Sequence, residues 1–324
     1  MEYVKLGRTG LKVSEYCIGG DNFGDQTDTA EAMRIMGKAF DNGVNFIDTA
    51  NSYVQGKSEE VISRFIKTRR SEVVLASKCR SKVGEGPNDI GVSRKSVMQA
   101  IDDSLRRLDT DYIDLYQVHS FDPTTPLDET LRAFDDLVHS GKVRYIGCSN
   151  FAGYQLTKAL WTSEKHNLAR FDSVQPRYNL LYREPERELF EVCRDQGVGV
   201  IPYSPQAGGF LLGKYRKDRE TTGTRLGEGF RAHQFYRRTY WHDIYFEAVE
   251  QFMAVTEKYG VSPMALALGW VRSNPVVTSC IVGARTEEQL DQNLKAWAED
   301  VPSEALDEAT RVGDWLRDNA PWPG

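Results

Sequence analysis

The chain has 324 residues, of which 40% are hydrophobic, 27% charged and 11% aromatic. This composition is typical of a soluble globular protein and excludes a largely disordered or collagen-like chain. The 41 basic and 47 acidic side chains leave a net charge of −6, which repels a polyanion. We therefore expect no nucleic-acid partner.

The 5 cysteines are scattered and include no C-x-x-C pair, which predicts the reducing environment of the cytoplasm. The first residues contain no apolar leader region, and no run approaches the ~20 apolar residues of a membrane span. The histidines show no H-x-x-x-H spacing, so we expect no metal site. These patterns predict a cytoplasmic protein without a membrane partner.

Short apolar runs recur along the chain, and each is followed by a longer stretch with helical spacing. The runs are residues 16–19, 44–47, 73–76, 112–116, 143–147, 173–175, 198–202 and 278–282. This alternation predicts β-α units of the α/β class, and eight such units close into a (β/α)8 TIM barrel. A doubly wound sheet is the alternative, but it would want a G-x-G-x-x-G after its first strand, which is absent.

Two helices of this barrel can be predicted in detail because their apolar residues form stripes. The stripes are Val97, Ile101, Leu105 and Leu108, and Leu127, Leu131, Phe134 and Leu137. For the second helix we expect Thr125 as the N-cap, Pro126 in the first turn and a stop at Gly141.

Three segments lie outside the β-α units. The first ~15 residues, in which Gly7 and Gly10 separate two short apolar stretches, predict a β-hairpin that plugs the barrel floor. Residues 204–245 are Gly-rich and then aromatic and basic, and a loop of that length is usually functional. The tail from Ser303 predicts an extra C-terminal helix. No linker is evident, so we expect one domain over residues 1–324.

Active sites of this barrel lie at the C-terminal ends of its strands. Asp48 and Tyr53 follow the second apolar run, Lys78 follows the third and His119 follows the fourth. Each residue alone is typical of a barrel rim. Together they bring an acid, a phenol, an amine and an imidazole to one face from adjacent strands.

From Leu6 to Asn293 the chain resembles the aldo-keto reductase superfamily, whose motifs it carries in the family's order. They are Phe46-Ile47-Asp48-Thr49-Ala50 with Tyr53, Ser77-Lys78, Val118-His119, Gly147-Cys148-Ser149-Asn150-Phe151, Gln175-Pro176 and Tyr203-Ser204-Pro205. The resemblance implies NADPH-dependent carbonyl reduction by the tetrad of Asp48, Tyr53, Lys78 and His119.

The chemistry of the four residues agrees with that role. Hydride transfer to a carbonyl builds negative charge on oxygen, so a proton donor is needed, and Tyr53 is the candidate. A neighbouring ammonium on Lys78 should lower the Tyr53 pKa from its usual ~10. Asp48 should keep Lys78 charged, and a neutral His119 can hydrogen-bond the carbonyl.

The resemblance also implies an NADP(H) site. Ser149, Asn150 and Gln175 would bind the nicotinamide carboxamide close to Asp48, and Tyr203 would stack on the ring. The pyrophosphate would lie on a glycine loop with two cations, and the 2′-phosphate and adenine at a helix start after the eighth strand. The residues implied are Ser204, Gln206, Gly208, Lys214 and Arg225 for the pyrophosphate, and Gly283, Arg285, Gln289 and Asn293 for the other end.

Two segments depart from the family's pattern. Gly20 and Asp21 stand where many members have a Gly-Thr turn, so an acid replaces a hydroxyl near the cofactor. Residues 230–241 are rich in aromatic and basic groups, which suits a lid over a polar ring such as a sugar. A packed surface loop is the alternative for this segment.

The substrate would be a small carbonyl compound, a keto sugar included. Two other functions stay open. A class I aldolase would use Lys78 to form a Schiff base, and a regulatory subunit would bind the cofactor without significant turnover, as potassium-channel beta subunits of this family type can. The chain shows no appended interaction segment, which favours an enzyme. The oligomeric state is open, with a homo-oligomer among the alternatives.

Overall fold

The computed structural model describes residues 1–218, 220–228, 230 and 233–320. The chain divides into two compact units. The first is Met1–Pro176, Pro185–Tyr203 and Val276–Asp291, and the second is Arg177–Glu184, Ser204–Pro275 and Gln292–Gly324. A single domain over the whole chain stays a prediction.

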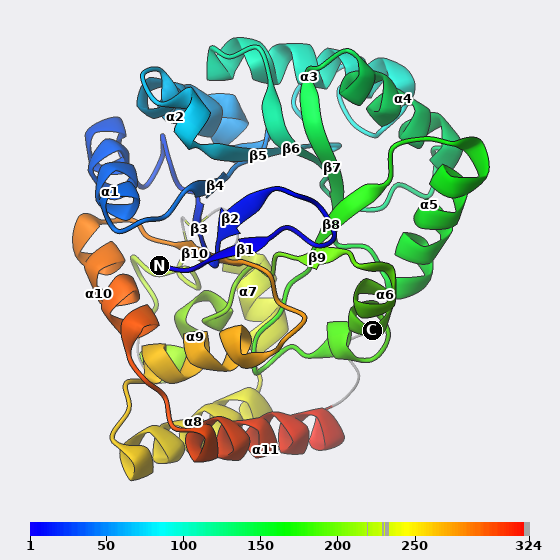
Figure 1. Ribbon diagram of the computed structural model, residues 1–324. Coiled ribbons are helices and arrows are strands. Elements are labelled where there is room, and N and C mark those ends of the chain that lie inside the picture. Colours follow the sequence, from blue (N-terminus) through cyan, green and yellow to red (C-terminus); the bar gives the residue numbers. More distant parts are fainter. Residues whose placement is uncertain (219, 229, 231–232, 321–324) are drawn as a thin grey trace. The chain divides into compact units, whose positions relative to one another are not determined.

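An eight-stranded parallel sheet in the order β10-β3-β4-β5-β6-β7-β8-β9 is the frame of the first unit (Figure 1). Its strands are β3 (Tyr16–Gly19), β4 (Phe46–Asp48), β5 (Val74–Cys79), β6 (Ile113–Val118), β7 (Val143–Ser149), β8 (Phe171–Gln175), β9 (Gly199–Val200) and β10 (Cys280–Gly283). The amides of Thr278 and Ile281 donate to the carbonyls of Val200 and Pro202 at 2.8 and 2.9 Å, which joins the two ends of the sheet. The predicted (β/α)8 barrel is confirmed.

Helices follow the strands, and consecutive helices of the first unit pack against one another around the sheet (Figure 1). They are α1 (Thr29–Asp41), α2 (Lys57–Ile66), α3 (Arg94–Leu108), α4 (Leu127–His139), α5 (Gly153–His166) and α6 (Leu189–Gln196). Short 3₁₀ turns lie at Tyr53–Gly56, Arg70–Glu72, Glu184–Glu186 and Ala207–Leu212. The apolar stripes predicted for α3 and α4 supply most of their buried residues.

The predicted cap of α4 is wrong. Pro126 is the N-cap residue, and it makes no side-chain capping bond. The Thr125 hydroxyl instead donates to Oδ2 of Asp122 at 2.9 Å, so it is not available to the helix. Gly141 follows the helix end with a φ of 74°, as expected of a helix stop.

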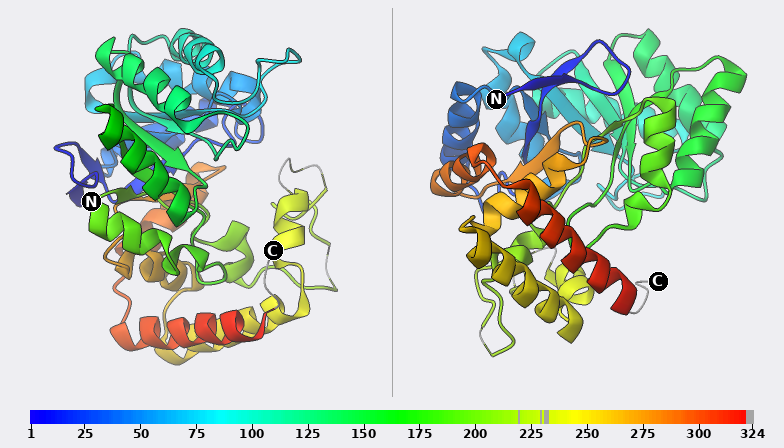
Figure 2. Two further views of the ribbon diagram at one scale, coloured as in Figure 1. Left: turned by 90° about the vertical axis from the view of Figure 1, so that its right-hand side faces the viewer. Right: turned by 60° about the horizontal axis from the view of Figure 1, so that its bottom comes forward.

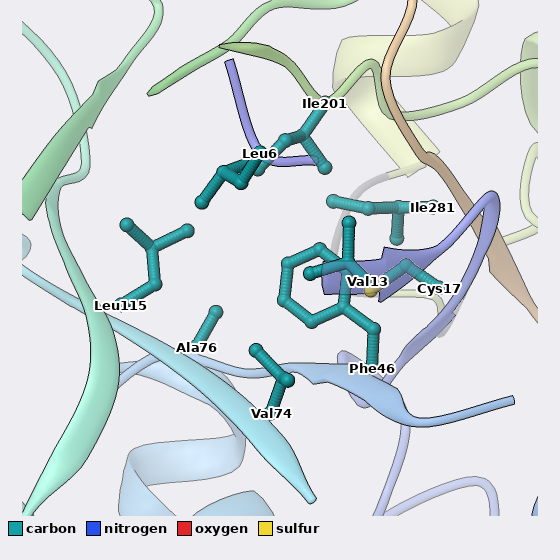
Figure 3. Close-up of a cluster of buried hydrophobic side chains, with 9 residues drawn as sticks. All are labelled: Leu6, Val13, Cys17, Phe46, Val74, Ala76, Leu115, Ile201 and Ile281. Atoms are coloured by element: carbon teal, nitrogen blue, oxygen red, sulfur yellow. The ribbon is translucent and has the colours of Figure 1, made fainter. Parts of the chain in front are cut away.

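The hairpin of β1 (Tyr3–Lys5) and β2 (Lys12–Ser14) closes the floor of the barrel, as predicted. Leu6 and Val13 are fully buried there and belong to one apolar cluster (Figure 3). The cluster is Leu6, Val13, Cys17, Phe46, Val74, Ala76, Leu115, Ile201 and Ile281. Gly7 has a φ of +53°, and a Cβ at this position would lie 2.5 Å from the Gly199 nitrogen, so only glycine allows the hairpin this approach.

The second unit is mainly helical. It contains α7 (His233–Tyr240), α8 (Asp243–Tyr259), α9 (Pro263–Ser273) and α11 (Ser303–Asn319), while α10 (Glu287–Ala298) continues from the first unit. Helix α11, the predicted extra C-terminal helix, packs along α8 (Figure 2). No helix in the described part of the chain is long and apolar enough to cross a membrane.

Candidate active site

A buried ion pair joins the ends of two neighbouring strands. Val74, Ala76 and Lys78 alternate along β5 and therefore share its inner face, where the first two belong to the apolar cluster. The Lys78 ammonium lies 2.5 Å from Oδ2 of Asp48 at the end of β4, and it also donates to the Thr49 carbonyl at 2.8 Å. Their side chains are 0% and 3% exposed, so the pair is held away from water.

The electrostatics of the pair favour the charged lysine. Burial lowers the pKa of Lys78, but Asp48 and Tyr53 together outweigh it, and that pKa lies above its ordinary value. Burial also raises the pKa of Asp48, while the ammonium and two glutamine amides oppose the rise. Lys78 is therefore an ammonium, with no lone pair, near neutral pH.

Tyr53 stands in the turn that follows β4, with its hydroxyl 3.1 Å from Nζ of Lys78. The ammonium also lies 4.7 Å from the centre of the phenol ring. Burial raises the pKa of Tyr53 more than Lys78 lowers it, and Asp48 adds to the rise. The predicted lowering of the Tyr53 pKa is therefore wrong. The sequence indicates the neighbouring ammonium, but it does not show that the phenol is removed from water.

His119 completes the group at the end of β6. Its ring lies edge-on to the Tyr53 ring, with centroids 5.7 Å apart. Its amide donates to the Cys79 carbonyl at 2.9 Å, and its carbonyl accepts a bond of 3.0 Å from the Asn150 side chain. The structure thus brings the predicted tetrad together. Ser81, which the sequence reasoning missed, lies with its hydroxyl 3.3 Å from Nδ1 of His119.

Two glutamine side chains donate hydrogen bonds to Oδ1 of Asp48, the carboxylate oxygen that does not face Lys78. Nε2 of Gln175 donates to Oδ1 at 2.9 Å, and Nε2 of Gln117 donates to the same oxygen at 3.3 Å. Gln175 was expected at a cofactor, whereas Gln117 was missed. Its place two residues before His119, on the same face of β6, was the available signal.

Ser149, Asn150, Gln175 and Tyr203 form a connected polar group in the first unit. The Ser149 hydroxyl donates to the Gln175 carbonyl at 2.8 Å, and the Asn150 amide donates to the Ser149 hydroxyl at 3.0 Å. The Tyr203 hydroxyl donates to Oδ1 of Asn150 at 2.9 Å. Asn150 has a φ of 55°, a left-handed conformation that asparagine tolerates better than most residues.

The turn after β3 lies against the end of β4. The Gly20 amide donates to the Asp48 carbonyl at 2.8 Å, and a Cβ on Gly20 would lie only 3.1 Å from the Ser58 hydroxyl. Asp21 accepts a bond of 3.0 Å from Asn22 and is among the charges that raise the pKa of Tyr53. The acid noted in the sequence is therefore close enough to influence the phenol.

The segment after β10 is fixed by hydrogen bonds at Arg285. Gly283 ends the strand in register with Gly19 of β3. The Arg285 amide donates to Oε1 of Gln289 at 2.9 Å, and its carbonyl accepts a bond of 3.1 Å from Thr27. Gln289 thus orders the residue before α10 by a side-chain bond to its backbone.

The remaining implied cofactor residues belong to the second unit. Gln206 donates to Oδ1 of Asn293 at 3.1 Å. Gly208 and Gly209 have φ values of +67° and +88°, and a Cβ on Gly209 would lie 2.7 Å from Nζ of Lys214. The glycine loop therefore carries an ammonium close to its backbone.

Tyr236 links three of these residues and was not predicted to do so. Its hydroxyl accepts a bond of 3.1 Å from Arg225 and lies 3.3 Å from that of Ser204. A Cβ on Gly208 would lie 2.5 Å from the Tyr236 ring. Tyr236 belongs to α7, within the segment 230–241 that was considered as a lid, of which residues 231–232 lie outside the described residues. Whether this segment acts as a lid stays a prediction.

A buried carboxylate supports β5 from outside the barrel. Glu59 of α2 is fully buried, accepts a bond of 2.6 Å from Ser77 and pairs with Nε of Arg107 at 2.8 Å. Ser77 precedes Lys78 and points to the opposite face of the strand. The sequence reasoning missed Glu59 and Arg107. In the described part of the chain, no group of three or more His, Cys, Asp or Glu side chains could hold a metal ion.

Comparison with known proteins agrees with this geometry. The pattern of the "Aldo/keto reductase family" matches residues 15–314. The chain is 42% identical over 307 residues to the "Uncharacterized oxidoreductase YrpG" of Bacillus subtilis (strain 168), and the match covers 91% of each. It is 36% identical over 302 residues to a "Probable voltage-gated potassium channel subunit beta" of Arabidopsis thaliana, again covering 91% of each. It is 37% identical over 300 residues to the "Putative aryl-alcohol dehydrogenase C977.14c" of Schizosaccharomyces pombe (strain 972 / ATCC 24843), covering 83% of this chain and 84% of the relative. The chain therefore belongs to the aldo/keto reductase family.

Proposed function

We propose that the protein is an oxidoreductase that reduces an aldehyde or ketone, a keto sugar included, to the alcohol by hydride transfer from NADPH. The observation that carries this proposal is the position of the Tyr53 hydroxyl 3.1 Å from the Lys78 ammonium, which is itself paired with buried Asp48. A phenol beside a fixed cation is suited to give up a proton to an oxygen that becomes negative.

The roles follow from the contacts. Bound NADPH would supply the hydride. Tyr53, whose pKa is raised by burial, is protonated near neutral pH and donates its proton to the carbonyl oxygen. The Lys78 ammonium stabilises the phenolate that remains, and Asp48 holds the ammonium in place. His119 hydrogen-bonds the carbonyl and orients it.

The polar group of the first unit has the chemistry to hold a nicotinamide carboxamide. A carboxamide needs both donors and acceptors, and the amides of Asn150 and Gln175 and the Ser149 hydroxyl offer both. The ring of Tyr203 would stack on the nicotinamide. Nε2 of Gln175 donates to Asp48 and, at 3.5 Å, to Gln117, so its amide oxygen would serve the cofactor as an acceptor.

The second unit contains a segment with the chemistry of a pyrophosphate site. Ser204, Ala207, Gly208 and Gly209 all have positive φ, and such turns direct backbone N–H groups into an anion-binding concavity. Lys214 and Arg225 provide positive charge nearby. In the first unit, Arg285 would pair with a 2′-phosphate, which is the basis for preferring NADPH to NADH.

A regulatory subunit that binds the cofactor is the second candidate, favoured by the similarity to the probable channel subunit of Arabidopsis thaliana. The aldolase alternative is weaker. A Schiff-base lysine must be a neutral amine when it attacks, whereas Lys78 has a raised pKa and is bound by Asp48.

The deciding experiment is turnover of a panel of aldehydes and ketones, followed by NADPH absorbance. Wild-type protein should oxidise NADPH, and Tyr53→Phe should lose about 10² or more in kcat while it still binds NADPH. Tyr154→Phe, at an exposed tyrosine of α5, is the matched control and should retain activity. NADPH binding without turnover of any carbonyl would favour the regulatory role, and borohydride trapping of substrate on Lys78 would favour the aldolase.

A further inference from the structure

Arg80 has an unusual backbone at the edge of the active site. It follows β5 directly, two residues after Lys78, and has a φ of +116°. Residues with a Cβ rarely adopt this conformation, and such positions concentrate where function requires them. The Arg80 carbonyl accepts a bond of 2.8 Å from the Gly91 amide, which ties the two ends of the loop 80–91 and holds the conformation.

The Arg80 side chain is partly buried, and it lies without a paired acid in the part of the chain that the structure describes. Among the residues that the structure describes, its Nε has no hydrogen-bond partner and no carboxylate forms an ion pair with it. Arg70 and Arg107, which also lie beside the sheet, pair with Asp114 and Glu59 at 2.7 and 2.8 Å. Burying a cationic N–H without an acceptor is unfavourable, so Arg80 is expected to gain from an anion.

Carboxylates in and beside the same loop have other partners, and Glu85 pairs with Lys82. Asp89 accepts a bond from the Gly86 amide, and Asp122 accepts bonds from the hydroxyls of Thr124 and Thr125. Neither is paired with Arg80. Within the described residues, the Arg80 guanidinium therefore has no acid paired with it.

The position of Arg80 connects it with the group that would handle the carbonyl. Its neighbour Cys79 accepts the backbone bond from His119, and its other neighbour Ser81 meets the His119 ring. Both sequence neighbours of Arg80 thus contact the residue that would orient the substrate.

We propose that Arg80 binds an anionic group of the substrate, a carboxylate or a phosphate ester, so that the preferred substrates are aldehydes or ketones that carry negative charge. The proposal rests on the proposed reductase function. A guanidinium offers paired N–H donors that match the oxygens of either anion, and a bound anion would neutralise its charge.

The test compares kcat/KM for charged and neutral carbonyl pairs in wild type, Arg80→Gln and Arg80→Gly. The pairs are 4-carboxybenzaldehyde and benzaldehyde, succinic semialdehyde and butanal, and glyceraldehyde 3-phosphate and glyceraldehyde. They separate a carboxylate from a phosphate and vary its distance from the carbonyl. Wild type should prefer the charged member of at least one pair by about tenfold or more, and both variants should lose that preference.

Two controls separate charge from folding. Glycine adopts a positive φ readily, so Arg80→Gly should be at least as stable as wild type and still lose the preference. Lys82→Gln removes an exposed cation of the same loop, which pairs with Glu85, and should leave the preference unchanged. NADPH affinity should also be unchanged in both Arg80 variants.

The outcomes distinguish this proposal from the reductase function. If no carbonyl is reduced, the reductase function fails, and fluorescence titration with benzoate and benzyl alcohol still tests Arg80, because wild type alone should bind the anion more tightly than the neutral compound. A wild type without preference for charged substrates or for benzoate overturns the proposal. The proposal is also overturned if Arg80→Gln prefers charged substrates as strongly as wild type, or if the variant loses NADPH affinity instead of this preference.

Discussion

The hydroxyl of Ser81 lies 3.3 Å from Nδ1 of His119, between the ends of two neighbouring strands. A neutral imidazole carries its proton on one nitrogen only. A hydroxyl that donates to Nδ1 therefore leaves the proton on Nε2, where it can be donated to a carbonyl oxygen. We expect Ser81 to be the donor, which in the proposed reaction would make it a positioning residue for the tautomer that is protonated at Nε2.

Replacement of Ser81 tests this relationship. Ser81→Ala should lower kcat by about tenfold, the scale of one positioned hydrogen bond, with little change in NADPH affinity. Ser81→Thr retains the hydroxyl and should restore most of the rate. Steady-state kinetics with one neutral aldehyde would decide, and equal rates in Ser81→Ala and wild type would contradict the role.

The raised pKa of Tyr53 predicts the pH dependence of both reaction directions. Reduction needs the protonated phenol, so its rate should be constant between about pH 6 and 9 and fall only above the usual tyrosine value of ~10. Oxidation of the alcohol needs the phenolate and should rise over the same range. A plot of log kcat against pH gives the answer, and a reduction rate that falls with a midpoint near pH 7 would be inconsistent with Tyr53 as the acid.

The barrel and its tetrad could be predicted because both depend on local pattern. Parallel strands buried on both faces are continuous apolar runs, so the strands could be counted from the sequence. Asp48, Lys78 and His119 lie at or next to the ends of consecutive strands, and neighbouring strand ends are neighbours in space. Burial could not be derived in the same way. Burial raises the pKa of Tyr53, whereas the sequence predicts that Lys78 lowers it. The contact between Gln117 and Asp48, which are 69 residues apart in the chain, likewise depends on the folded barrel.

The hydrogen-bond partners of loop side chains could not be predicted from the sequence either. Threonine is a common N-cap residue, but the Thr125 hydroxyl donates to the Asp122 carboxylate, three residues earlier, instead of accepting a bond from the helix. Tyr236 contacts Ser204, Gly208 and Arg225. These contacts depend on the irregular path of the segment after β9, which no hydrophobic periodicity predicts. Polar loop residues have several partners within reach, and only the folded backbone selects among them.

Arg285 tests the coenzyme preference. If it pairs with the 2′-phosphate, Arg285→Ala should weaken NADPH binding by about 1.5 to 3 kcal/mol and leave NADH almost unchanged. Lys295→Ala removes an exposed cation from α10 and serves as the control for net charge. Fluorescence titration with both coenzymes measures the effect, and equal losses for NADPH and NADH would assign Arg285 another role.

Asp172 in β8 predicts a pH-dependent loss of stability. Burial raises its pKa to about 6, against opposition from Arg170 and Arg8. The folded state therefore favours the protonated acid, and the stability that it contributes is present below the unfolded pKa of ~3.9 and lost as the pH rises through about 6. Asp172→Asn, which carries no charge, should be more stable than wild type by about 1 to 3 kcal/mol at pH 8 and not at pH 4.

Urea unfolding of both proteins at the two pH values measures this difference. Asp111→Asn, at an exposed aspartate before β6, is the matched control and should show no such dependence. A constant difference between Asp172→Asn and wild type across the pH range would mean that the Asp172 carboxyl titrates alike in the folded and unfolded chains.

Tyr236 separates two roles for α7, cofactor binding and substrate covering. Deleting the helix would remove Tyr240, which is fully buried and accepts a bond of 3.1 Å from Asn179, so the second unit would lose stability for reasons unrelated to function. Tyr236→Phe keeps the ring against Gly208 and removes only the hydroxyl that meets Arg225 and Ser204. The point variant is therefore the cleaner probe.

If Tyr236 positions Arg225 and Ser204 for the pyrophosphate, Tyr236→Phe should weaken NADPH binding by about five- to tenfold, the scale of one charge-assisted hydrogen bond, with kcat within about twofold of wild type. Phe235→Leu, at the exposed residue beside it on α7, should bind NADPH normally. Titration of NADPH and steady-state kinetics on both variants measure this. If both variants instead raise KM for the carbonyl and leave NADPH affinity intact, α7 acts on the substrate, as a lid would, because closure over a bound carbonyl positions it and excludes water.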